Sequence, residues 1–214
     1  MVPTKTRPSL SLYRTAFLLA LFTILYNVVE GMISTYLGAE DESLALFGFG
    51  MDSFIEVISG FGIAHMILRI QNNPDSPRGK FERGELQITG TAFYLLVLGL
   101  VLGSTWTIWN QEKPETTVWG VIIALISIAV MWALVVWKKN IGTKLNSAPL
   151  LADANCTKVC LYMSGILLIS SGLYELFGVI YLDSLGALGL AYFAFKEGKE
   201  CFQKANSSDY CQCH

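Results

Sequence analysis

Charged residues are scarce in this chain of 214 residues, at 15% of the total, and nearly balanced, with a formal net charge of −2. That balance gives no basic surface of the kind that nucleic-acid binding requires. The 19 glycines form no phosphate-binding loop, and no Ser/His/Asp or metalloprotease pattern is present in the sequence. These absences argue against a nucleic-acid partner and against an enzyme.

Apolar residues dominate instead, at 53% of the chain, with a mean hydropathy of +0.48. Such a composition is too apolar for a soluble domain and is typical of a multi-pass integral membrane protein. Six stretches approach or exceed the roughly 20 residues that cross a bilayer as a helix. They cover residues 14–37, 43–70, 86–109, 116–137, 147–177 and 179–195.

The rest of the chain is too short for another folded domain, which needs about 50 residues. We therefore predict an all-α membrane protein with a six-helix transmembrane domain at 14–200, preceded by a tail at 1–13. A short cysteine-containing tail is expected at 201–214.

Basic residues are distributed unevenly between the two sets of loops. Thirteen lie before the first span or after the second, fourth and sixth, whereas Lys113 alone lies on the other side, beside Glu112 and Glu115. Because Lys and Arg are retained in the cytoplasm, both termini are predicted to be cytoplasmic. The short loops fit a bacterial inner (plasma) membrane.

Ionisable side chains inside the spans are few, and each is a candidate functional residue because its charge is costly in lipid. Asp52 and Glu56 are four residues apart, as are Cys156 and Cys160, so each pair lies on one helical face. Asp52 lies about 13 Å from the outer start of its span, and Cys156 lies about 13 Å from the cytoplasmic start of its span, so both are close to the bilayer midplane. Two carboxylates and two thiols are therefore expected to meet there.

A weak internal repeat supports this expectation. Residues 43–56 align without a gap on residues 147–160, which places Asp52 and Glu56 on Cys156 and Cys160. A 3+3 inverted repeat of this kind locates a transporter's binding site at the midplane, between the repeats. Four ligands suit a tetrahedral cation, and thiols favour Zn²⁺ or softer ions. The alternative is that the two cysteines pack as small apolar side chains.

These motifs resemble the cation diffusion facilitator family of divalent-metal/proton antiporters. Residues 43–56 resemble the family's second helix with its paired ligands, and residues 151–160 resemble its fifth helix. Asn27 and Glu30 in the first span and Asp183 in the sixth also match, and the likeness covers about residues 15–200. The resemblance implies export of a divalent cation from the cytoplasm in exchange for protons.

The chain departs from the family pattern at its expected ligands. Cys156 and Cys160 stand where the family usually has His and Asp, and Glu56 stands where Asp is usual. We therefore expect a substrate such as Zn²⁺ or Cd²⁺, with Hg²⁺ and Pb²⁺ as softer alternatives. No resident cofactor is expected besides the transported metal ion. The cytoplasmic domain that commonly follows the sixth span in the family is not expected here. Dimerisation through that domain is therefore not implied by the resemblance, and a homodimer stays an open alternative.

Other ionisable residues have more than one interpretation. Asp153 either binds or orients the metal site from the cytoplasmic side, or is a charge at the start of a helix. Lys158 points away from Cys156 and either pairs with an acidic span residue or offsets the charge of the site. Glu30 either lines the exit path or makes a hydrogen bond between helices.

The last four residues of the chain contain three soft ligands. Cys211, Cys213 and His214 either capture cytoplasmic metal ions or belong to an unstructured, reduced tail. Two other function classes remain alternatives to transport. They are a membrane thiol-redox enzyme and a transport-inactive partner that senses metal.

Overall fold

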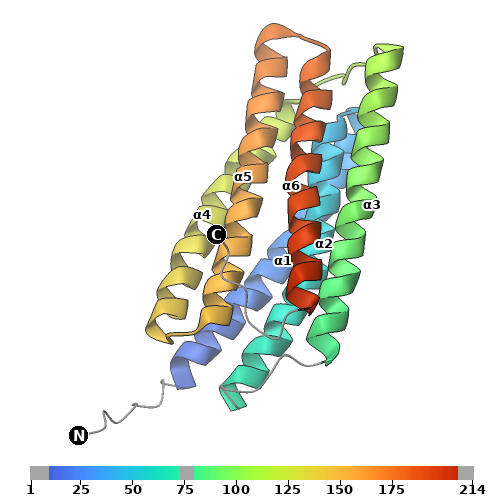
Figure 1. Ribbon diagram of the computed structural model, residues 1–214. Helices are drawn as coiled ribbons and strands as arrows, with labels where there is room; N and C mark the ends of the chain where they lie inside the picture. The colour runs from blue at the N-terminus through green and yellow to red at the C-terminus, as the bar shows by residue number, and fades with distance from the viewer. Residues whose placement is uncertain (1–9, 73–79, 207–214) are drawn as a thin grey trace, which may run out of the picture.

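The structure is a computed structural model that describes residues 10–72 and 80–206, and over these residues it is entirely helical with short connections. The helices form one elongated bundle in which neighbours in the chain run in opposite directions (Figure 1). They are α1 (Leu10–Glu40), α2 (Leu44–Asn72), α3 (Lys80–Asn110), α4 (Val118–Lys144), α5 (Ala148–Phe177) and α6 (Tyr181–Asn206). The predicted all-α class and the six helices are confirmed.

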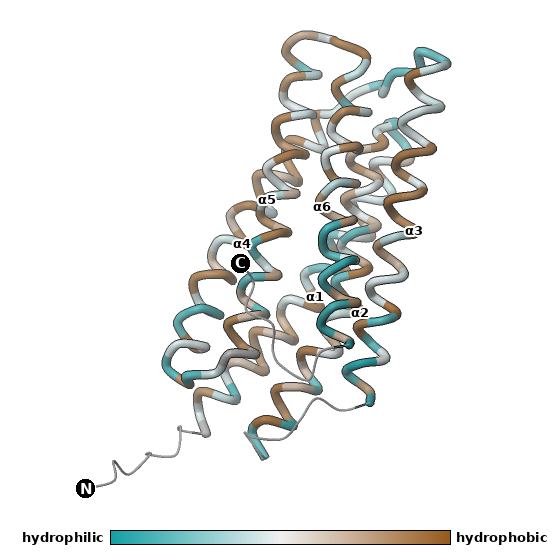
Figure 2. Tube along the Cα trace, in the orientation of Figure 1, coloured by the Kyte–Doolittle hydropathy of each residue, from teal (hydrophilic) through white to brown (hydrophobic). Residues whose placement is uncertain are grey.

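Helices α1 to α5 are long and apolar enough to cross a membrane. Helix α6 is less apolar, because charged residues at Asp183 and Lys196 leave only residues 184–195 free of charge between them. Its C-terminal half is correspondingly hydrophilic, in contrast to the hydrophobic middle of the neighbouring α3 (Figure 2). The chain is thus a multi-pass membrane protein whose last helix is partly polar.

The outside of the bundle is apolar and much of its inside is polar. Leu95 on α3 and Trp132 on α4 are more than 60% exposed, whereas Asn27, Thr89 and Ser127 are fully buried. This distribution suits a protein whose surroundings are lipid tails, since the polar groups find hydrogen-bond partners only inside the bundle.

Several helices extend beyond the predicted spans. Helix α3 begins at Lys80 rather than at residue 86, and α6 continues to Asn206 rather than ending at residue 195. Consequently Cys201 and Lys204, which the sequence assigned to a tail, lie on the last two turns of α6. Figure 1 shows that the end of α6 lies at the same end of the bundle as the start of α1.

Helices α4 and α5 are joined by hydrogen bonds at three levels along their length. Near one end the Thr117 hydroxyl donates to the Ser171 carbonyl over 2.9 Å, and in the middle the Ser127 and Ser164 hydroxyls lie 2.9 Å apart. Near the other end α4 and α5 are joined by a buried ion pair, described below. All of these groups are buried, so α4 and α5 form one cross-linked pair.

Two apolar clusters stabilise opposite ends of the bundle. One cluster joins α1, α2, α4 and the start of α5, and the other joins α2 through α6 near their opposite ends. The first includes Ile67 and Leu134, and the second includes Leu46 and Leu167. Polar residues of α2 and α5 lie between the two clusters.

Candidate metal site

A cavity of about 120 Å³ lies inside the bundle, among residues of all six helices. Asp52, Glu56, Cys156 and Cys160 all line it, and we call these four residues the central site. The cavity extends from Asn27 and Asp52 toward the end of the bundle where α1 begins and α6 ends. The structure thus brings the two sequence pairs of α2 and α5 to one cavity.

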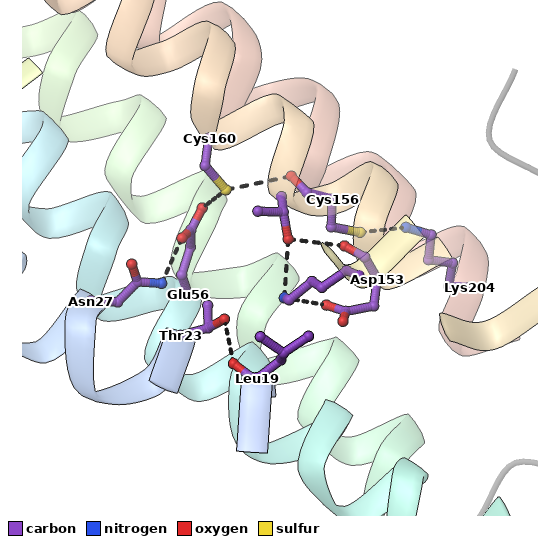
Figure 3. Close-up of polar contacts among 10 residues, drawn as sticks. Leu19, Thr23, Asn27, Glu56, Asp153, Cys156, Cys160 and Lys204 are labelled. Carbon is purple, nitrogen blue, oxygen red and sulfur yellow. Dashed lines mark hydrogen bonds and ion pairs between the residues drawn. The ribbon is translucent and has the colours of Figure 1, made fainter. Parts of the chain in front are cut away.

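Glu56 and Cys160 are in direct contact across this cavity. The Cys160 thiol donates a hydrogen bond to Glu56, and the Asn27 amide donates to the other carboxylate oxygen over 2.7 Å (Figure 3). Cys160 also lies 3.4 Å from the backbone carbonyl of Cys156. Residues of α1, α2 and α5 therefore meet at the Glu56 carboxylate.

Asp52 is one turn before Glu56 and is only 2% exposed. Within the described residues its Oδ1 atom has no hydrogen-bond partner, and the same is true of the Asn27 Oδ1 atom. Buried acceptors without a donor are unfavourable and rare. Both residues line the cavity, whose carboxylates and thiols are of the types that bind metal cations.

Cys156 is directed differently from Cys160. Its sulfur accepts a hydrogen bond from the Lys204 ammonium of α6 over 3.4 Å (Figure 3). Lys204 also pairs with Glu200 over 3.3 Å. In the part of the chain that the structure describes, no three His, Cys, Asp or Glu side chains lie close enough to hold a metal ion. The four residues of the central site share a cavity, but they do not form a closed coordination sphere in this conformation.

Asp153 makes a buried ion pair that the sequence analysis did not foresee. Its carboxylate lies 3.0 Å from the Lys138 ammonium of α4, which also donates to the Thr157 hydroxyl over 3.1 Å. Lys138 is one of the thirteen basic residues that the sequence places outside the predicted spans, but it is 6% exposed and belongs to α4. A carboxylate at this depth requires a partner. The presence of Asp153 in the sequence therefore indicated that a basic side chain packs against it.

Glu30 is held in a separate network beside the cavity. It accepts hydrogen bonds from the Tyr26 hydroxyl over 2.8 Å and from the Ser53 hydroxyl over 3.1 Å. The bond to Ser53 joins α1 to α2, so the interhelical interpretation of Glu30 is the one that the structure favours. Lys158 does not line the cavity.

Asp183 lies at the far end of α6 and accepts hydrogen bonds at the start of α2. Its partners are the Ser43 hydroxyl, over 2.6 Å, and the backbone amide of Leu44, over 2.8 Å. A carboxylate in this position satisfies free amides at the N-terminus of a helix. Asp183 therefore positions α2.

Cys211, Cys213 and His214 lie outside the described residues.

Several polar cavity residues were not assigned to the site from the sequence, among them charged residues and a cysteine of α3 and α6. Glu85 comes from α3, and Glu197, Cys201 and Lys204 come from α6. The last three are separated by four and three residues, so they lie on one helical face. This spacing was visible in the sequence, but it became informative only because α6 extends beyond residue 195.

A family model described as the cation efflux transmembrane domain matches residues 16–208 of this chain. The match includes every residue of the central site and nearly all of the six helices. No curated protein matches the chain.

Proposed function

Because the chain belongs to the cation efflux family of transporters, we propose that it exports divalent heavy-metal ions from the cytoplasm in exchange for protons. The substrate class is Zn²⁺ and Cd²⁺, with Hg²⁺ and Pb²⁺ as softer members. The central site is the proposed place of binding, and the protein is proposed to act in a bacterial inner membrane with both termini in the cytoplasm.

The observation that supports this proposal best is the pair of unsatisfied oxygens in the cavity. The Oδ1 atoms of Asp52 and Asn27 are buried without a hydrogen-bond donor among the described residues. Both lie around the same cavity as the Glu56 carboxylate and the Cys160 thiol. A bound divalent cation would compensate these acceptors and would be held by carboxylate and thiol ligands together.

The two cysteines support the choice of metal. Thiolates prefer Zn²⁺ and softer ions, whereas Mg²⁺, Ca²⁺ and Mn²⁺ prefer sites made of oxygen ligands. Cys156 and Cys160 both line the cavity on α5. Both are reduced thiols in the structure, with the Cys156 sulfur next to Lys204 and the Cys160 thiol next to Glu56.

Exchange with protons follows from the charges that the ligands would carry. Two carboxylates and two thiolates without a metal ion would repel one another in a poorly solvated cavity. We expect the Cys160 thiol, which faces Glu56 as a hydrogen-bond donor, to keep its proton while no metal ion is bound. Metal binding would displace the protons that the ligands hold, so each half of the cycle would move metal and protons in opposite directions.

The proposal is tested with the full-length protein in liposomes under an imposed pH gradient, with Cd²⁺ uptake and proton movement followed together. Asp52→Asn is expected to reduce the uptake rate at least tenfold, because it removes a buried ligand. Replacing Cys156 and Cys160 with serine is expected to lower the ratio of Cd²⁺ to Zn²⁺ uptake. Glu115→Gln, at an exposed carboxylate in the loop between α3 and α4, is the control and leaves both unchanged.

Two results would contradict the proposal. If the parent protein moves no protons in response to Cd²⁺, antiport is excluded. An unchanged uptake rate in Asp52→Asn, together with an unchanged metal ratio in the cysteine double variant, would exclude the central site.

A further inference from the structure

The cavity contains a second group of metal-binding side chains toward α6. Cys156, Cys201 and Glu197 line this part of it, the first from α5 and the other two from successive turns of α6. Cys201 is 7% exposed and Glu197 is 8% exposed. All three line the same cavity, and Glu197 and Cys201 lie four residues apart on one face of α6. Among the described residues these side chains do not form a closed metal site, so binding requires them to turn toward one another.

A cation of the protein itself already lies at this place. The Lys204 ammonium is 3.4 Å from the Cys156 sulfur (Figure 3). Lys204 is 8% exposed. A buried positive charge next to a sulfur, among carboxylates, shows that the surroundings stabilise a cation there. The Lys204 side chain is long and flexible, so it can withdraw toward Glu200, with which it already pairs.

We propose that Cys156, Cys201 and Glu197 form a second binding site for soft divalent cations, the α6 site, which metal ions occupy on their way to the central site. Two thiolates and a carboxylate leave one position of a tetrahedral ion open for water. Metal binding displaces Lys204 from Cys156 and releases the protons of the two thiols. This inference rests on the proposed function, since the α6 site would supply the same metal ions to the same cavity.

Cys156 would belong to both sites, which suggests how an ion passes between them. Cys156 and Cys160 are one helical turn apart, or about 6 Å along the helix axis. An ion held by Cys156 and Cys201 reaches the central site when Cys160 replaces Cys201 as its second sulfur ligand. Cys156 remains bound throughout, so the ion never loses all of its thiolate ligands inside the bundle.

The α6 site is tested by the ultraviolet absorption of Cd²⁺–thiolate bonds in the purified full-length protein. Cys211 and Cys213 are first replaced with serine, which leaves three cysteines in the chain. Adding Cys160→Ser to this background removes the thiol that belongs to the central site alone, and absorption from two thiolates, those of Cys156 and Cys201, is expected to persist. Adding Cys201→Ser as well is expected to halve that absorption. Equal absorption with and without Cys201 would overturn the proposal.

A second variant tests the site without removing a thiol. Lys204→Gln removes the competing ammonium and is expected to tighten Cd²⁺ binding about tenfold in the Cys160→Ser background. Lys199→Gln, an exposed lysine on the same helix, is the matched control and leaves the affinity unchanged. Equal affinities in the two lysine variants would also overturn the proposal.

Transport measurements distinguish a failure of the α6 site from a failure of the proposed function. In the parent protein at limiting Cd²⁺, Cys201→Ser is expected to raise the half-saturating concentration severalfold while the maximal rate stays within twofold. If Cys201→Ser transports like the parent at every Cd²⁺ concentration, the α6 site is wrong and the central site stands. If the parent itself transports no metal, the proposed function fails as well.

Discussion

Replacing Asn27 with leucine removes the amide that donates to Glu56 and leaves a side chain of similar size. The lost hydrogen bond spans 2.7 Å and ends on a carboxylate inside the bundle. Bonds to charged groups contribute about 1.5–3 kcal/mol, which corresponds to roughly 10- to 150-fold in affinity. Loss of a group that orients a metal ligand typically costs about 10- to 100-fold. The hydrogen-bond energy and the typical cost of losing an orienting group thus predict losses of metal affinity of similar size.

We therefore expect Asn27→Leu to raise the half-saturating Cd²⁺ concentration about 10- to 100-fold, measured as initial uptake rates in liposomes. Ser34→Ala is the matched control, because Ser34 lies seven residues later on α1 and is also fully buried, with a hydroxyl that has no partner among the described residues. It is expected to stay within twofold of the parent. A folded Asn27→Leu protein with an unchanged half-saturating concentration would refute the assignment of Glu56 as a ligand that Asn27 orients.

Two further predictions concern the fold and its orientation. Lys138→Met leaves the Asp153 carboxylate buried without its ion pair, and we expect it to lower the free energy of unfolding in detergent by about 3–5 kcal/mol. Adding Asp153→Leu is expected to recover most of that loss, and an equal loss in the double variant would show that the pair is not what stabilises this end of α4. Cys211 and Cys213 are expected to react with a membrane-impermeant thiol reagent only from the cytoplasmic side, and labelling from the other side would reverse the topology.

The helices, and the meeting of the four central-site residues at one cavity, could be predicted because their signals are local. An apolar run of about 20 residues identifies a span without knowledge of its neighbours. The four-residue spacing of Asp52 and Glu56, and of Cys156 and Cys160, fixes one face of each helix. The depth of both pairs along their spans then predicted that they share one level, and in the structure they line one cavity.

The partners of these residues could not be predicted, because they depend on how the helices pack. Lys138 and Lys204 lie near helix ends, where basic residues usually reach the membrane surface. Only the packing of α4 against α5 brings Lys138 to Asp153, and only the packing of α6 against α5 brings Lys204 to Cys156. The sequence indicated where charge was unusual, but not which charges would meet.

The three-level connection between α4 and α5 determines which bonds a change of conformation must break. Moving α4 apart from α5 would disrupt the buried bonds at Thr117, Ser127 and Lys138 together. Glu56 on α2 and Cys160 on α5 are linked through the hydrogen bond that a bound cation would replace. The lowest barrier is therefore expected for a rotation of α4 and α5 as one rigid body against α2. A bound metal ion would replace that hydrogen bond with its own bonds to Glu56 and Cys160, so α2 and α5 would stay linked at this level whether the site holds a proton or a metal ion.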